Sequence, residues 1–118
     1  MSHDLMVFQF KNSSIRTFEW NGVIKFVAKD VADILLYIEP HKAIQRHCKN
    51  PVALNELKKQ WDETNYCNEI NELHPRSLII EESDVFRLII NSQMEEAEKF
   101  ENWLMEEVLP TIRKTGQY

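Results

Sequence analysis

The stretch IRTFEWNGVIKFVAKDVADILLYI, residues 15–38, decides the fold because its pattern passes from strand to turn to strand to helix. Residues 15–20 place their side chains alternately on two faces, as a β-strand does. Asn21-Gly22 is a dipeptide that favours a tight hairpin turn, since both residue types tolerate positive φ angles. The apolar run of residues 23–27 completes the hairpin. This stretch therefore predicts two antiparallel strands that lead directly into a helix.

The residues that precede this hairpin predict one more strand. Residues 6–10 alternate between apolar and polar, and the polar run of residues 11–14 breaks the alternation as a turn. We therefore expect a three-stranded antiparallel meander at the N-terminal end of the chain.

Two helices are expected after the meander. Asp30 can accept hydrogen bonds from the free amides of the first helical turn, and apolar residues continue at helical spacing as far as Ile38. Glu39-Pro40 interrupts this helix, because a residue that precedes proline avoids the α conformation. Proline itself suits the first turn of a new helix. The second helix is therefore expected from His41 to about Lys49.

The middle of the chain is predicted to contain two more helices and a late strand. We expect a helix after Pro51 that reaches Trp61, a loop over residues 62–73, and a strand at residues 78–80 that returns to the sheet. Ser83 is the expected N-cap of the next helix, which runs to about Asn91. The apolar residues of that helix are expected to be mostly buried: Val85, Phe86, Leu88, Ile89 and Ile90.

A long helix is expected from about Gln93 to Leu109. Its apolar stripe consists of Met94, Ala97, Phe100, Leu104 and Val108. Pro110 is expected to kink or restart it. Strands followed by helices, with one late strand, are typical of an α+β fold. The predicted fold is a small N-terminal antiparallel β-meander with a late additional strand, packed against several helices including a long C-terminal helix.

Length and composition are those of one globular domain. The 118 residues are 43% hydrophobic and 28% charged, which suits a single packed core over residues 1–118. No apolar run reaches the roughly 18 residues that a membrane span needs. The first residues also lack the basic and apolar regions of a signal peptide. We therefore expect a cytoplasmic protein without a membrane partner.

Charge is distributed unevenly along the chain. The formal net charge is −5, which by itself argues against a nucleic-acid partner. Residues 1–50 contain seven basic and five acidic residues, a balance of +2, whereas residues 51–118 contain seven basic and fourteen acidic residues, a balance of −7. Because the local field guides an anionic partner more than the net charge does, a basic surface in the first half remains a credible DNA contact.

The second expected helix has one polar, basic face. Four of its residues recur at i, i+3, i+4 and i+7: Lys42, Gln45, Arg46 and Lys49. Arginine and lysine bind guanine edges or phosphates, and the glutamine amide can read adenine. This face is the candidate contact with double-stranded DNA. The alternative interpretation of the same four residues is an ordinary solvated helix face.

Other basic residues are weaker candidates for the same contact. Lys29 precedes the candidate helix, and Lys25, Lys58 and Lys59 could reach phosphates on either side of it. Arg113 and Lys114 lie near the end of the last helix. Their two interpretations are a second phosphate contact and a favourable interaction with the negative end of the helix dipole.

The acidic last helix suggests a second class of function. Its carboxylates are Glu95, Glu96, Glu98, Glu101, Glu106 and Glu107. A solvated face is one interpretation, and docking onto a basic surface of a repressor is the other. The alternative function is therefore a protein interaction module, and a homodimer is a further partner that remains open.

Enzyme and metal chemistry find little support in the sequence. With only Gly22 and Gly116, the chain has no glycine-rich phosphate loop, and no serine or cysteine has an identifiable base partner. The histidines and the two cysteines, Cys48 and Cys67, match no zinc-binding spacing. We expect no catalytic residues, no metal and no cofactor.

Three separated blocks of the sequence resemble the N-terminal domain of the BRO family. The first is Trp20–Tyr37 together with Lys42–His47, the second is Glu82–Ile89, and the third is Phe100–Trp103 with Glu106–Tyr118. Residues 50–76 depart from the family pattern, in which a short strand connection is usual. Three blocks in the right order make this resemblance specific.

The resemblance implies a DNA-binding module of a phage or prophage antirepressor or transcriptional regulator. That family occurs in phages, prophages and large insect DNA viruses, and its domain is regarded as DNA-binding. Such a domain is usually the front part of a longer protein, so this chain is expected to be either such a part or a stand-alone version. The resemblance further implies a location in the cytoplasm of a host bacterial cell.

Overall fold

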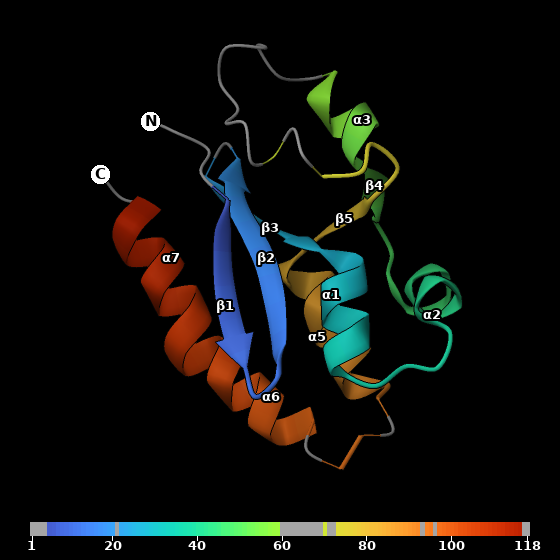
Figure 1. Cartoon of the computed structure of the whole chain (residues 1–118), viewed down its shortest axis with the longest axis vertical. Helices are drawn as coiled ribbons and strands as arrows, with labels where there is room; N and C mark the ends of the chain where they lie inside the picture. The colour runs from blue at the N-terminus through green and yellow to red at the C-terminus, as the bar shows by residue number, and fades with distance from the viewer. Residues whose placement is uncertain are drawn as a thin grey trace.

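The structure is a computed structural model that describes residues 5–20, 22–59, 70, 73–92, 94–95 and 97–116. The strands are β1 (Met6–Phe10), β2 (Ser13–Trp20), β3 (Val23–Val27), β4 (Val52–Ala53) and β5 (Leu78–Glu81) (Figure 1). The helices are α1 (Ala28–Ile34), α2 (Pro40–His47), α3 (Leu54–Lys58), α5 (Glu82–Ile90), α6 (Ala97–Trp103), the π-helical segment η2 (Leu104–Val108) and α7 (Leu109–Gly116).

The strands form one antiparallel sheet in the order β1-β2-β3-β5-β4. The predicted meander is confirmed, and the late strand β5 joins it beside β3 through the pair Phe26 and Ile80. The first turn is shorter than predicted: Phe10 pairs with Ser13, so Lys11 and Asn12 alone close it. Lys11 adopts a φ of 56° there, which allows this tight reversal.

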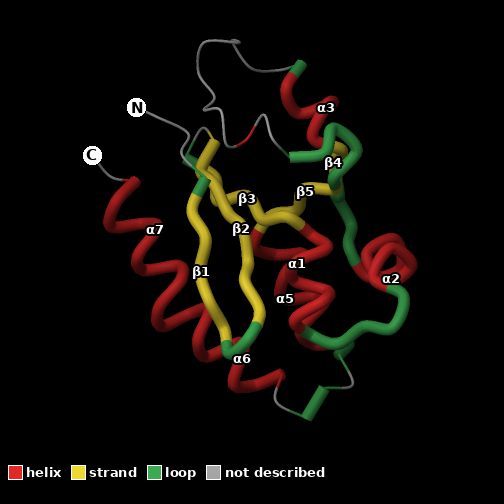
Figure 2. Tube along the Cα trace, in the orientation of Figure 1, coloured by secondary structure: helices red, strands yellow, loops and turns green. Residues whose placement is uncertain are grey.

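Helices cover both faces of the sheet (Figure 2). On one face, Ile15, Phe26 and Ile80 belong to the larger core cluster, which also contains the buried residues of α1, α5, α6, η2 and α7. On the other face, Phe18 and Ile79 pack with residues of α3 and with Ile70 and Leu73. The α+β prediction, including the helix at the C-terminal end, is therefore confirmed.

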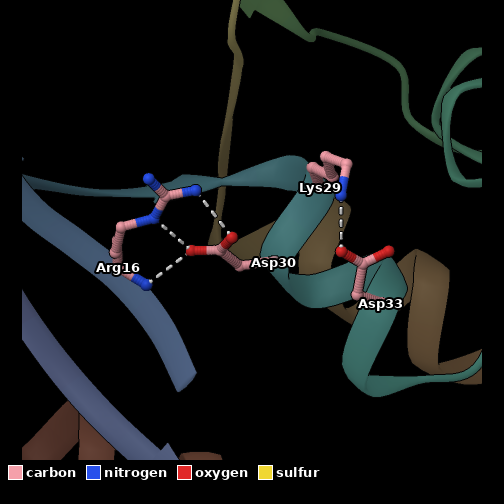
Figure 3. A network of polar contacts seen from close by, with 4 residues as sticks. All are labelled: Arg16, Lys29, Asp30 and Asp33. Carbon is pink, nitrogen blue, oxygen red and sulfur yellow. Dashed lines mark hydrogen bonds and ion pairs between the residues drawn. The ribbon is translucent and has the colours of Figure 1, made fainter. Parts of the chain in front are cut away.

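Asp30 has a different role from the predicted helix cap. Helix α1 begins at Ala28, directly after β3, and its N-cap Val27 makes no side-chain capping bond. The Asp30 carboxylate instead accepts hydrogen bonds from the backbone N–H of Arg16 at 3.0 Å, from its Nε at 2.7 Å and from its Nη2 at 2.8 Å (Figure 3). The reason is topological: the chain leaves the sheet at Val27, so Asp30 supplies the acceptor that a continued strand would have offered to Arg16.

The connection between α1 and α2 is a tight helix end. Leu36 adopts a left-handed φ of 62°. Its N–H donates to Asp33 O and the N–H of Tyr37 donates to Ala32 O, which is the Schellman pattern. The Tyr37 hydroxyl then donates to Leu88 O at 2.7 Å. These bonds anchor the start of α2 to α5.

Residues 52–53 are a strand rather than the start of the predicted helix. Val52 pairs with Ile79 and Ala53 with Leu78, so the helix begins only at Leu54 and ends at Lys58. The partner strand β5 lies about 25 residues further along the chain, which local periodicity cannot reveal. The predictions for Trp61, for Cys67 and for most of the 62–73 loop lie outside the described residues.

Two details of α5 correct the predictions. The helix begins at Glu82, and Ser83 lies inside it because the preceding residue Glu81, still extended from β5, is the N-cap. Val85, Leu88 and Ile89 are buried, but Ile90 is 78% exposed. Ile90 is the last helical residue. Its side chain points away from the core because it lies about 100° around the helix from the buried Ile89.

The C-terminal helix accommodates Pro110 through a π-helical segment, η2, that interrupts the α-helical hydrogen-bond pattern just before the proline. Regular α6 begins at Ala97, four residues later than predicted, and η2 follows with a bond from the N–H of Leu109 to Leu104 O. This i−5 bond widens the turn just before proline, which has no N–H to donate. The predicted apolar stripe is confirmed where it matters most: Phe100, Leu104 and Val108 are fully buried. Within the described ranges, no helix is long and apolar enough to cross a membrane.

Candidate nucleic-acid interface

Helix α2 lies at one side of the molecule with one face against the core and the other in solvent (Figure 1). Pro40 occupies the first helical position, which needs no N–H. Ala43 and Ile44 are buried against the cluster that contains α1 and α5, and Ile44 is only 2% exposed. The sequence pattern therefore fixes which face of α2 points outward.

Three of the four predicted contact residues share that outward face. Lys42, Gln45 and Arg46 are all exposed. Lys42 Nζ lies 3.1 Å from Glu39 Oε1, and Gln45 Nε2 lies 3.1 Å from His41 Nε2. Such exposed contacts contribute little stability, so either side chain can exchange its partner for a DNA group at small cost. The Arg46 guanidinium makes no ion pair with any described residue.

Lys49 lies beyond the end of α2 rather than on it. The helix ends at His47, and Cys48 is extended. The reason is a set of bonds to α5: the N–H groups of Lys49 and Asn50 donate to the two carboxylate oxygens of Asp84 at 2.9 and 3.0 Å. The Lys49 side chain remains exposed next to the C-terminal end of α2. It therefore extends the basic surface without belonging to the helical stripe.

Asp84 is the buried carboxylate that holds this end of α2 in place. It is 1% exposed and also accepts a hydrogen bond from Arg87 Nη1 at 2.6 Å. Burial favours its neutral form, but the two backbone N–H groups and the Arg87 guanidinium outweigh burial and lower the pKa of Asp84. Asp84 is therefore charged at neutral pH.

Cys48 sits beside Asp84 as an inert thiol. Its Sγ lies 4.0 Å from Asp84 O. Burial, followed by the negative charge of Asp84, raises the pKa of Cys48 to about 12. A thiol that stays protonated is neither a nucleophile nor a good metal ligand. The part of the chain that the structure describes contains no group of three or more His, Cys, Asp or Glu side chains arranged to hold a metal.

A groove opens between α1, the first turn of α2 and the residues that precede β5. We call it the cationic groove. Its volume is about 300 Å³, and its lining consists of Arg16, Val27, Lys29, Pro40, His41, Ile44, Arg76, Ser77 and Leu78. Arginine, lysine and histidine side chains from distant parts of the sequence thus meet around an apolar floor. Lys29 Nζ is paired with Asp33 Oδ2 at 2.8 Å (Figure 3).

Sequence reasoning missed Arg16, His41 and Arg76 as site residues. Arg76 lies two residues before the strand predicted at residues 78–80. That predicted strand is the sequence feature that indicates a position for Arg76 near the sheet. The position of β5 beside β3 was not predictable, and this position brings Arg76 to the α2 side of the molecule. Lys29 is the one weaker candidate that the structure brings to this surface.

The other basic candidates are not gathered around α2. Arg113 and Lys114 lie on α7, on the opposite side of the molecule (Figure 1), and Arg113 Nη2 binds both carboxylate oxygens of Glu82 at 3.0 and 3.2 Å. Lys25 is 9% exposed and holds Glu81 at 2.7 Å, so it is buried rather than available for a phosphate. Lys59 is paired with Glu56 on α3.

The acidic surface is also separated from α2. Glu98, Glu106 and Glu107 are exposed on α6 and η2, and Figure 1 shows α6 at the lower end of the view, away from α2 at the right. Exposed carboxylates therefore gather on α6 and η2, whereas exposed cationic side chains gather on and beside α2. A polyanion is attracted by the cationic side chains around α2.

The chain is similar to a known protein family. The model of the BRO family N-terminal domain matches residues 14–110. An uncharacterised protein of Haemophilus influenzae is 38% identical over 112 residues, covering 94% of this chain and 51% of that protein. No solved structure matches.

Viral proteins also match. Bro-N domain-containing protein J of Lymantria dispar multicapsid nuclear polyhedrosis virus is 31% identical over 108 residues, covering 80% of this chain and 25% of that protein. A Bro-N domain-containing protein of Autographa californica nuclear polyhedrosis virus is 33% identical over 108 residues, covering 80% of this chain and 31% of that protein. The chain thus spans about half of the Haemophilus relative and a quarter to a third of these two viral ones.

Proposed function

For a chain that belongs to the BRO family N-terminal domain, we propose that its function is to bind double-stranded DNA through the outward face of α2, within a phage or prophage antirepressor or transcriptional regulator. The family is generally associated with DNA binding. The observation that carries the proposal is the exposed face of α2, on which Lys42, Gln45 and Arg46 lie together and Arg46 forms no ion pair with any described residue.

The dimensions of α2 suit a short probe of the major groove. Its eight residues give it a length of about 12 Å. The diameter of a helix with its side chains, about 10–12 Å, matches the width of the major groove, about 12 Å. In this arrangement Arg46 pairs with a guanine edge or a phosphate, and Gln45 offers its amide to adenine. Lys42 and Lys49, at the two ends of the surface, bind phosphates and set the register of the helix on DNA.

The rest of the fold orients this probe. Asp84 fixes the C-terminal end of α2 through Lys49 and Asn50, and Tyr37 fixes its start through Leu88 O. A helix that is ordered before binding loses less entropy when it enters the groove. The acidic side keeps the domain from binding in other orientations.

The test is the salt dependence of DNA affinity for the variant Lys42→Ala/Arg46→Ala. With about three phosphate contacts, the slope of log K against log salt is expected near −3 for the natural chain. The double variant is expected to lower affinity by at least tenfold, measured by fluorescence anisotropy on a labelled duplex. It is expected to reduce the slope by about 2 if Arg46 binds a phosphate and by about 1 if Arg46 binds a guanine edge. Lys99→Ala, which removes the same kind of charge from α6, is the matched control and is expected to leave the slope unchanged. An unchanged slope in the double variant would refute the assignment of α2.

The acidic surface favours a second candidate function. Met105 is exposed on η2 and is followed by the exposed residues Glu106 and Glu107, so this short segment offers both an apolar side chain and two carboxylates. This combination suits a basic partner protein, such as a repressor. Under this alternative, a repressor binds to α6 and η2, and substitutions on α2 leave its capture unchanged.

A further inference from the structure

We propose that the cationic groove binds a phosphate group, with Arg76 and Arg16 as its principal donors. The proposal deepens the proposed function, on which it rests for the source of the phosphate: we expect a backbone phosphate of the DNA that α2 contacts. The other source of the same chemistry is a free mononucleotide or inorganic phosphate. The groove lies directly beside the first turn of α2, because Pro40 and His41 form part of its lining.

Arg76 is the uncompensated charge of the groove. Its side chain is exposed and makes no ion pair within the described part of the chain. Its backbone is held in a tight turn, in which the N–H of Arg76 donates to His74 Nδ1 at 3.0 Å and the N–H of Ser77 donates to His74 O at 2.9 Å. The turn is tied to α3 by bonds from Leu54 to Ser77 O and from Asn55 to Pro75 O, both 2.8 Å. A fixed backbone thus presents a cation that has no ion-pair partner among the described residues.

Arg16 is oriented before any ligand arrives. Asp30 binds its backbone N–H, its Nε and its Nη2, which immobilises the guanidinium. Figure 3 shows the remaining terminal nitrogen turned away from Asp30. Since arginine has five N–H donors, Asp30 leaves several of them for a second acceptor. Planar guanidinium groups of this kind recognise phosphate oxygens by paired hydrogen bonds.

Lys29 and the start of α2 add to the positive field. Lys29 Nζ is paired with Asp33 in an exposed i,i+4 contact, which contributes little stability and can be exchanged for a phosphate. Helix α2 has no acidic residue in its first turn and no side chain that caps its amides, because the N-cap carboxylate of Glu39 pairs with Lys42 instead. The positive end of the helix dipole therefore remains open beside the groove.

The floor of the groove strengthens these interactions. Val27 is 2% exposed, Ile44 is buried, and Leu78 is half-buried. Apolar walls exclude water and lower the local dielectric constant, so a charge pair gains more here than on an open surface. A volume of about 300 Å³ is ample for a phosphate and its flanking sugar.

The first experiment tests the groove without DNA. Inorganic phosphate and thymidine 5′-monophosphate are titrated separately into the ¹⁵N-labelled chain at constant ionic strength. Saturable shifts are expected at the amides of His41, Arg76 and Ser77 and at the Nε–H of Arg16. Arg76→Ala is expected to remove the shifts, Arg76→Lys to retain them in part, and the control Lys99→Ala to leave them unchanged. Absence of saturable shifts in the natural chain overturns the phosphate site.

The second experiment identifies the source of the phosphate. On a DNA duplex, Arg76→Ala is expected to weaken binding about fivefold and to reduce the salt slope by about 1, as the loss of one phosphate contact does. If the slope is unchanged but the monophosphate still binds the natural chain, the groove is a phosphate site for a free ligand. If Lys42→Ala/Arg46→Ala weakens DNA binding while Arg76→Ala changes neither DNA nor phosphate binding, the inference fails and the proposed function stands. If the natural chain binds no duplex but phosphate still causes saturable shifts of the groove amides, the phosphate site stands and the proposed DNA-binding function fails.

Discussion

The substitution Asp84→Asn tests how the fold holds the candidate DNA helix. Asp84 is 1% exposed and accepts three hydrogen bonds, from the N–H groups of Lys49 and Asn50 and from Arg87. Asparagine keeps the shape of the side chain, but it removes the charge and replaces one acceptor oxygen with a donor. An N–H group of residue 49 or 50 then faces another donor.

The magnitude follows from the burial of the two partners. Removing one member of a buried ion pair costs about 3–5 kcal/mol. The Arg87 side chain is 33% exposed, so water can solvate it after the substitution, and the cost falls at or below the lower end of that range. We expect Asp84→Asn to lower the free energy of unfolding by about 2–3 kcal/mol. For a domain of this size the melting temperature should fall by about 8–12 °C.

Urea unfolding followed by circular dichroism measures this loss. The matched control is Asp33→Asn, which removes a carboxylate from an exposed i,i+4 pair with Lys29 and is expected to leave the unfolding midpoint close to that of the natural chain. Equal unfolding midpoints for the two variants would refute the structural role of Asp84. DNA affinity of Asp84→Asn should fall as well, because Lys49 loses its anchored position.

The pH dependence provides a second readout of the same carboxylate. The pKa of Asp84 is lowered in the folded state. Its contribution to stability is therefore fully present above the unfolded-state pKa of about 3.9 and is lost as the pH falls through the folded-state value. The difference in unfolding free energy between the natural chain and Asp84→Asn should be constant near neutral pH and should shrink below about pH 4. A difference that is independent of pH contradicts the assignment.

Two further substitutions test the packing that surrounds the sheet. Thr17 is fully buried on β2, and its hydroxyl has no hydrogen-bond partner among the described residues. Thr17→Val is therefore expected to raise the free energy of unfolding by about 1 kcal/mol, measured by urea unfolding. A loss of stability in this variant would show that the hydroxyl makes a hydrogen bond. Leu36 adopts a φ of 62°, and its side chain is 69% exposed. Leu36→Gly is expected to stabilise the domain by about 0.5 kcal/mol, measured by thermal unfolding. The reason is that the relief of backbone strain is larger than the entropic cost of ordering glycine from the unfolded chain. Destabilisation by Leu36→Gly would show that the Leu36 side chain makes a contact that outweighs the strain.

The sequence predicts local elements of this fold well and distant pairings poorly. Alternation over residues 15–27 and the helical spacing after residue 28 depend only on near neighbours, and both are present in the structure. Strand β4 has only two residues and exists because β5 pairs with it. Asp30 looks like a helix cap in the sequence, but its partner is Arg16, fourteen residues earlier.

The candidate site shows the same division. The exposed face of α2 is readable from spacing, because Ala43 and Ile44 determine which side is buried. Lys49 departs from that face because Asp84, 35 residues later, ends the helix. Arg76 joins the surface only through the order of the strands, which no local pattern encodes. Contacts between residues that the strand order brings together therefore cannot be predicted from local sequence patterns and are seen only in the structure.

Mapping DNA-induced shifts on the ¹⁵N-labelled chain identifies the surface of the domain that contacts DNA. A labelled spectrum with a titrated duplex reports every backbone amide at once, so it distinguishes the two sides of the domain. The largest shifts are expected at residues 40–49, with smaller ones at residues 76–77. Shifts concentrated on α6, η2 and α7, with none on α2, would contradict DNA binding through α2.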